Sequence, residues 1–141
     1  NVPKASAPGV VTGRSGLLGK VFYIQKDFFP LNTTLWVKEF YLATPVFSYF
    51  LLRTIDFNVF NAGSAVPTLN RNHLCSLSFS LPPVSLIHHF TEITTPLMER
   101  IQSTKNENET LITLRDTLLP KLISGEVRVS DAENMLEEVG I

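Results

Sequence analysis

The chain has 141 residues, of which 44% are hydrophobic and 18% charged, so it is long enough to bury a core and is not a disordered chain. Its single cysteine, Cys75, excludes an internal disulfide and a thiolate zinc cluster and fits a reducing cytoplasm. No apolar run approaches the roughly 20 residues that a membrane helix requires, and no basic leader precedes an apolar core, so we expect neither a membrane partner nor a signal peptide.

The net charge of −1 hides an uneven distribution. Residues 1–80 carry seven basic and three acidic side chains, whereas residues 81–141 carry five basic and ten acidic ones. Such a division indicates a first part that meets a polyanion and a second part that meets protein or water. An excess of four positive charges is modest for a DNA-binding domain, however, and a solvated surface gives the same pattern.

The first half of the chain predicts short strands and one helix. Val10–Thr12 and Val21–Ile24 are β-prone runs on either side of a glycine-rich turn, and Thr34–Val37 is a third strand candidate. Thr44 followed by Pro45 predicts the start of a helix of about three turns, because threonine caps free amide groups and proline suits the first helical position. After the short apolar run Phe57–Phe60, a loop is expected over residues 61–72.

Period-2 alternation over Leu77–Leu81 predicts one more strand, and the double proline at residues 82 and 83 marks a boundary. Beyond it the apolar residues recur every three or four positions, which predicts one long amphipathic helix, or two consecutive ones, ending at Gly125. Pro96 and Pro120 should kink or end the helix, and Lys105–Glu109 weakens its apolar stripe. The apolar positions expected to form a subunit interface are Phe90, Ile93, Leu97, Ile101, Leu111, Leu114, Leu118 and Leu122.

A helical region of about forty residues is roughly 60 Å long, longer than a globular domain of about 80 residues, so part of its apolar face needs a partner. The alternative is that the face covers the chain's own β-domain. The sequence Ser130-Asp131-Ala132-Glu133 is a capping box, which predicts a last short helix from Ser130 to about Val139. The start of the chain at Asn1 is interpreted as the C-terminal piece of a longer protein.

The segment Leu114–Val129, which contains the run Leu-Arg-Asp-Thr-Leu-Leu-Pro-Lys-Leu-Ile-Ser-Gly, closely resembles the helix-end signature of the specificity subunit of type I restriction-modification enzymes. Three further segments resemble that family in the same order: the hairpin Pro8–Val21, the loop Gly63–Asn70 and the hinge Leu81–Pro83. One segment departs from the family, because Leu86–His89 stands where an acid-glutamine pair usually precedes the helix.

The resemblance implies an α+β fold: a small mixed α/β target-recognition domain followed by a long amphipathic C-terminal helix of coiled-coil type. The expected divisions are 1–82 for the later part of a DNA target-recognition domain, 83–125 for the dimerisation or spacer helix, and 126–141 for a short helix or tail. Two such helices pack antiparallel in the family and dock methyltransferase (modification) subunits, and through them a restriction subunit. Whether the chain ends a full-length subunit or is most of a half-length subunit is left open.

The resemblance implies a cytoplasmic, non-catalytic scaffold without cofactors, and the motifs agree with it. Gly13–Lys20 is not a phosphate-binding Walker loop, because arginine replaces its first glycine and a strand follows it. Leu81–Val84 lacks the acid or amide before Pro-Pro that a methyltransferase loop needs. His88 and His89 are adjacent and therefore point in different directions on a helix. No cluster of acids and cysteines accompanies them, so a surface or interface position is expected rather than a metal site. Trp36 is expected in the core rather than as a platform for a base.

The residues expected to bind double-stranded DNA are Arg14, Lys20, Lys26, Arg71 and Asn72. Arginine reads guanine with two hydrogen bonds and asparagine reads adenine, although each of these side chains is equally suited to a phosphate contact. Two other classes of function remain. One is a helical assembly module that does not bind DNA, and the other is a free-standing enzyme that uses His73 and Cys75.

Overall fold

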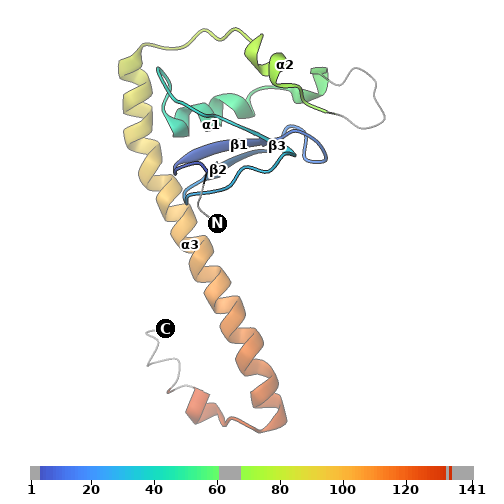
Figure 1. The fold of residues 1–141 in the computed structure, drawn as a ribbon. Helices are drawn as coiled ribbons and strands as arrows, with labels where there is room; N and C mark the ends of the chain where they lie inside the picture. Colours follow the sequence, from blue (N-terminus) through green and yellow to red (C-terminus); the bar gives the residue numbers. More distant parts are fainter. Residues whose placement is uncertain (1–3, 61–67, 133, 135–141) are drawn as a thin grey trace. The chain divides into compact units, whose positions relative to one another are not determined.

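A computed structural model describes residues 4–60, 68–132 and 134, with the side chain of Asn58 left aside. The chain divides into two compact units, Asn1–Thr95 and Pro96–Ile141. Figure 1 shows the order of the elements, with the strands and short helices before the double proline and one long helix after it. The expectation of an α+β protein with a small β-domain and a long C-terminal helix is confirmed at this level. None of the helices in the described ranges combines the length and apolar character that a membrane-spanning segment requires.

The first unit is built on a three-stranded antiparallel sheet with the order β2-β1-β3. The central strand β1 (Gly9–Gly13) is buried at every position, because it is paired on both sides and covered on both faces. Its partners are β2 (Val21–Ile24), in register Val10 with Tyr23, and β3 (Thr34–Trp36), in register Val11 with Trp36. All three strands lie where the sequence predicted them.

The glycine-rich segment between β1 and β2 folds tightly against the end of the sheet. The amide of Gly13 donates to the carbonyl of Lys20 at 3.2 Å, and a side chain at Gly13 would place its Cβ 2.7 Å from the carbonyl carbon of Leu17. Only glycine lets the backbone approach that closely, which accounts for this residue at the end of β1. The turn is also tied to a distant segment, since the amide of Leu69 donates to the carbonyl of Arg14 at 2.8 Å.

Helix α1 (Pro45–Arg53) begins as the sequence predicted, although its nine residues make two and a half turns rather than three. The Thr44 hydroxyl accepts from the amide of Phe47 and also shares a hydrogen bond of 2.6 Å with the hydroxyl of Thr91. Phe47 and Phe50 both meet the ring of Phe90 edge to face, at 5.7 and 5.6 Å between ring centroids. These contacts join α1 to the first turns of the long helix within the first unit.

One expectation for residues 57–81 is wrong. Phe57–Phe60 forms a short 3₁₀ helix, η1, and of the loop expected over residues 61–72, residues 68–70 lie outside the helices and named strands, while helix α2 (Arg71–Cys75) begins within its last two positions. The Asn70 side chain caps the amide of Asn72. The expected strand Leu77–Leu81 is coil, because alternation alone does not form a strand without a neighbour to pair with, and none of the described strands pairs with it. Residues 61–67, which include most of the segment Gly63–Asn70, lie outside the described residues.

Helix α3 (Val84–Ser124) is one helix of 41 residues, and it is continuous across Pro96, Lys105–Glu109 and Pro120. Neither proline ends it. Gly125 follows with φ +74°, the left-handed conformation that commonly terminates a helix and that side chains disfavour. In the first unit, Ile87 is 1% exposed, so this part of the helix buries one face against its own domain.

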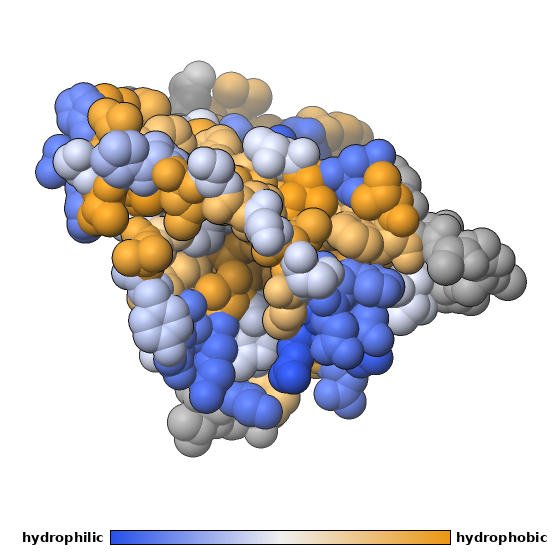
Figure 2. Space-filling model, turned by 90° about the horizontal axis from the view of Figure 1, so that it is seen from above, coloured by the Kyte–Doolittle hydropathy of each residue, from blue (hydrophilic) through white to orange (hydrophobic). Residues whose placement is uncertain are grey.

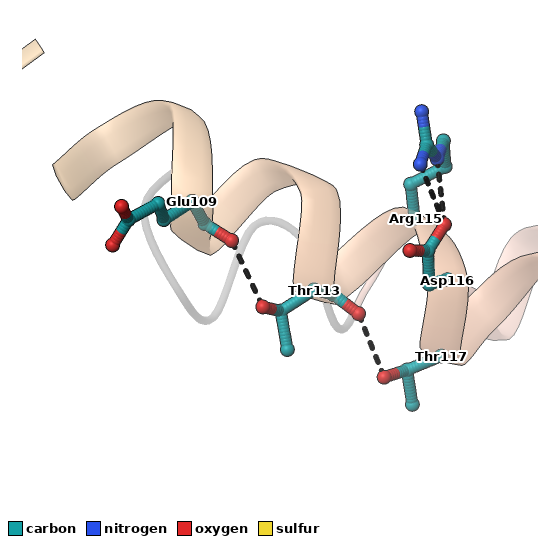
Figure 3. A network of polar contacts seen from close by, with 5 residues as sticks. All are labelled: Glu109, Thr113, Arg115, Asp116 and Thr117. Atoms are coloured by element: carbon teal, nitrogen blue, oxygen red, sulfur yellow. Dashed lines mark hydrogen bonds and ion pairs between the residues drawn. The ribbon is translucent and has the colours of Figure 1, made fainter. Parts of the chain in front are cut away.

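The second unit consists of α3 from Pro96 onward and the residues that follow it. Figure 3 shows how its polar side chains are satisfied locally: the hydroxyls of Thr113 and Thr117 donate to backbone carbonyls four residues earlier, and Arg115 pairs with the neighbouring Asp116 at 2.7 Å. Residues 129–132 and 134 are helical, which places the start of the last helix one residue before the expected Ser130. The remainder of that expected helix lies outside the described residues.

Candidate functional site

Three of the predicted DNA-binding residues lie on segments that the backbone ties together at one end of the sheet. Arg14 and Lys20 flank the β1–β2 turn, which the bond between Gly13 and Lys20 closes. Arg71 opens α2, two residues after Leu69, whose amide bonds to the carbonyl of Arg14. All three cationic side chains belong to exposed residues. The fold therefore brings positive charge from residues 14–20 and residue 71 to the same end of the first unit.

A fourth cation at this end, Arg53, was missed by the sequence reasoning. It occupies the last turn of α1 and lines an open cleft of about 330 Å³ together with Gly19, Lys20, Val21, Phe22 and Tyr49. In the sequence, Arg53 shows only the ordinary pattern of a basic residue at a helix C-terminus, where the helix dipole favours a positive charge. We call Arg14, Lys20, Arg53 and Arg71 the turn-end cations.

The structure does not bring Lys26 to this group. Lys26 follows β2, whose last residue Ile24 pairs with Gly9 at the opposite end of the hairpin from the turn. At about 3.3 Å per residue, the strand alone separates the two ends of the hairpin by more than 10 Å. Asn72 lies in α2 beside Arg71 and is exposed. Its backbone is already used by the helix, so its side-chain amide is the group left for a ligand.

A larger cavity of about 480 Å³ lies in the same unit, between the β1–β3 face of the sheet and helices α1 and α2. Its wall includes Trp36, Leu52 and Leu74, with Lys38 and Arg71 as the charged members. Figure 2 shows apolar side chains gathered around a hollow on the face of the molecule that it views, with hydrophilic residues below the hollow and at the upper corners of the view. Trp36 is half-buried and meets Phe28 edge to face at 6.2 Å, so it combines packing within the domain with a place in the cavity wall.

The candidate dyad of His73 and Cys75 is not assembled as a nucleophile and base. The His73 ring stacks on Phe60 with centroids 5.3 Å apart, and its Nδ1 atom is enclosed without a hydrogen-bond partner in the described part of the chain. Cys75 is exposed and lines the cavity beside Trp36. Within the described ranges no three His, Cys, Asp or Glu side chains gather to hold a metal ion. His88 and His89 are both exposed, and the Nδ1 atom of His89 lies 3.8 Å from the Oε2 atom of Glu92.

The predicted interface residues of α3 fall into three groups. Phe90 packs on the aromatic side chains of α1 within the first unit. The next apolar positions are exposed, with Leu97 at 59% and Ile101 at 49%. The last three, Leu114, Leu118 and Leu122, are partly buried. We call the exposed apolar residues of α3 in the second unit the α3 stripe. Three of its members, Ile112, Leu119 and Ile123, were not among the predicted interface residues. The stripe consists of Leu97, Ile101, Leu111, Ile112, Leu119 and Ile123.

The chain is similar to a curated protein, the type I restriction enzyme MjaIX specificity subunit of Methanocaldococcus jannaschii, with 33% identity over 82 residues. The matched region covers 58% of this chain and 18% of the relative, so the chain corresponds to less than a fifth of that protein. No protein-family model matches the chain, and no solved structure matches it. The similarity agrees with the resemblance found in the sequence and supports the same family.

Proposed function

We propose that this chain recognises duplex DNA as part of the specificity subunit of a type I restriction-modification enzyme and that it is not itself catalytic. The observation that carries the proposal is the 33% identity with a specificity subunit over 82 residues. The proposed domain boundaries are residues 1–82 for part of a target-recognition domain, 83–125 for the spacer helix and 126–141 for a short helix or tail. Because such a subunit acts on DNA, its proposed location is the cytoplasm.

The DNA-binding surface that we propose is the end of the first unit where the turn-end cations lie. Lysine and arginine side chains that neutralise phosphates release condensed counterions, which gives affinity without sequence information. Arg14, Arg71 and Asn72 are the proposed base-reading side chains, because guanidinium and carboxamide groups match guanine and adenine in the major groove. Lys26 is proposed as a more distant phosphate contact at the other end of the hairpin.

The test of DNA recognition is the affinity of the chain for a random pool of duplexes at several salt concentrations. Contact with two phosphates, one at Lys20 and one at Lys26, predicts a slope of about −1.8 in log affinity against log salt. Selection from the pool then shows whether the chain prefers a sequence. An affinity that does not change with salt would refute the proposed surface, and it would favour the second candidate, a helical assembly module that does not bind DNA.

The second candidate draws its support from the α3 stripe, which we also propose as the docking surface for a second specificity helix in coiled-coil fashion and for methyltransferase subunits. Leu97 and Leu111 are both exposed, and at 100° per residue they point within roughly 40° of each other. Apolar side chains that recur on one exposed helix face are the pattern of an interface between helices.

Co-expression with a methyltransferase subunit of the same restriction-modification system tests this surface. We expect the purified complex to be lost in the double variant Leu97→Asp/Leu111→Asp, because two buried carboxylates without partners oppose association. The matched control is Asn106→Asp/Thr113→Asp, which adds the same two negative charges roughly 140° or more around the helix from both Leu97 and Leu111. Equal loss of the complex in both double variants, or in neither, would contradict the assignment of the stripe.

A further inference from the structure

We propose that Lys20 and Arg53 together hold a single phosphate group in the cleft at the C-terminal end of α1. The proposal rests on the proposed function, in which that phosphate belongs to the DNA backbone, and it gives Arg53 a specific role on the binding surface. The two residues are 33 positions apart in the sequence, and both line the same open cleft of about 330 Å³. A pair of cations converging on one cleft matches the charge of a phosphate and its several acceptor oxygens.

Arg53 is held in position by an aromatic group. Its guanidinium donates from one terminal nitrogen to the hydroxyl of Tyr49 at 3.1 Å, and its Cζ atom lies 5.3 Å from the centroid of the same ring. Tyr49 is fixed in turn by Tyr23 and Phe50, at 5.7 and 5.0 Å between ring centroids. One bond to Tyr49 leaves the other N–H groups of the guanidinium for a ligand. Arg53 is therefore partly ordered before any ligand arrives, which lowers the entropy lost on binding.

Lys20 is placed by the backbone of the turn. Its amide donates to the carbonyl of Leu17 at 3.1 Å, and its carbonyl accepts from Gly13. These bonds fix the point at which the side chain leaves the end of the sheet. Neither Lys20 nor Arg53 belongs to any of the ion pairs found in the described part of the chain. The positive charge of the cleft is therefore not neutralised by a carboxylate from those residues.

A simpler role for Arg53 would be to cap the last carbonyl groups of α1. Two of those carbonyls already have donors: Leu51 accepts from both the amide and the hydroxyl of Thr54, and Leu52 accepts from the amide of Ile55. The Arg53 guanidinium bonds to Tyr49 instead. The negative end of the helix dipole favours the arginine and disfavours an anion, but its effect is weak and screened by salt at an exposed site. Two cations that hydrogen-bond directly to the phosphate outweigh this effect of the dipole.

Two cations on one phosphate give a distinctive salt dependence. A neutralised phosphate releases one set of counterions whether one cation or two contact it. We therefore expect Lys20→Gln and Arg53→Gln each to weaken duplex binding about tenfold, which is the loss of one charge-assisted hydrogen bond, while the salt slope changes little. The double variant should lose about 0.9 from the slope. Separate losses of about 0.9 in each single variant, adding in the double variant, would show two phosphates and overturn the proposal.

The control variant is Lys4→Gln, which removes one positive charge from an exposed residue bonded through its backbone to Phe28, away from the turn. It should change the duplex affinity by less than about twofold and leave the salt slope unchanged. Thermal unfolding of each variant shows whether the fold is retained, and Arg53→Lys, which keeps the charge, provides a second measurement. Recovery of the slope in a Lys20→Gln/Arg53→Lys chain is expected.

Titration with inorganic phosphate separates this proposal from the proposed function. Amide chemical shifts should move at Gly19–Val21 and at residues 49–53 of the unchanged chain and should not move in the double variant. Such shifts without any duplex binding would refute DNA recognition and retain a site for free phosphate. Duplex binding with an unaltered slope in the double variant, and no phosphate-induced shifts, would refute the cleft and retain DNA recognition.

Discussion

The substitution Leu69→Ala tests how the turn-end cations are assembled. Leu69 is fully buried, and its amide bonds to the carbonyl of Arg14, so one residue both fills the core and ties the segment before α2 to the β1–β2 turn. Burial of a leucine side chain contributes roughly 1.5–3 kcal/mol, and the cavity left by its removal adds to the loss. We expect the free energy of unfolding to fall by about 2–5 kcal/mol.

Urea unfolding followed by fluorescence measures this loss, because Trp36 is the single tryptophan and lies in the first unit. With a urea dependence of about 2 kcal/mol per molar, the midpoint should fall by roughly 1–2.5 M. Leu42→Ala is the matched control, because Leu42 is 64% exposed in the same unit and its truncation should cost less than about 0.5 kcal/mol.

Two results would contradict this reasoning. A loss below about 1 kcal/mol for Leu69→Ala would mean that the segment before α2 does not depend on this side chain. A loss equal to that of Leu42→Ala would mean that burial does not distinguish the two positions. If the variant folds, its duplex affinity should also fall, because Arg71 follows by two residues the segment that Leu69 ties to the β1–β2 turn.

Three further predictions concern local structure. Thr44→Ala removes the N-cap of α1 and should lower the free energy of unfolding by about 1 kcal/mol; an unchanged urea midpoint would refute the capping role. Gly13→Ala places a methyl group against the backbone of Leu17 and should cost about 1–3 kcal/mol, so a stable variant would contradict the close approach. The Tyr41 hydroxyl donates to the Glu39 carboxylate and is the main cause that lowers the pKa of Glu39 below 4.5, with Lys38 adding to it. Because the pKa of Glu39 is lowered on folding, its small stabilisation of the folded chain is present above the unfolded pKa and is lost as the pH falls through the folded pKa. Tyr41→Phe should therefore raise the midpoint of the Glu39 titration followed by NMR, and an unchanged midpoint would contradict the role of this hydrogen bond.

Local signals in the sequence were sufficient for the elements that depend on neighbouring residues. The three strands, the threonine-proline start of α1 and the glycine that ends α3 all follow from side-chain and backbone preferences within a few positions. The apolar residues that recur every three or four positions after the double proline likewise predicted α3. The strand expected at Leu77–Leu81 failed because strand formation depends on a partner, which the alternation of five residues does not supply.

Only the tertiary structure decided which residues come together. Periodicity showed that α3 is amphipathic, but packing decided that Phe90 covers α1 and that Ile87 is buried while Leu97 stays exposed, because neighbouring helix faces are equally apolar in the sequence. The placement of Lys20 and Arg53 around one cleft depends on the docking of α1 beside the β1–β2 turn. Contacts between residues 33 positions apart are set by the packing of whole elements, so no local pattern of residue types could have predicted the cleft.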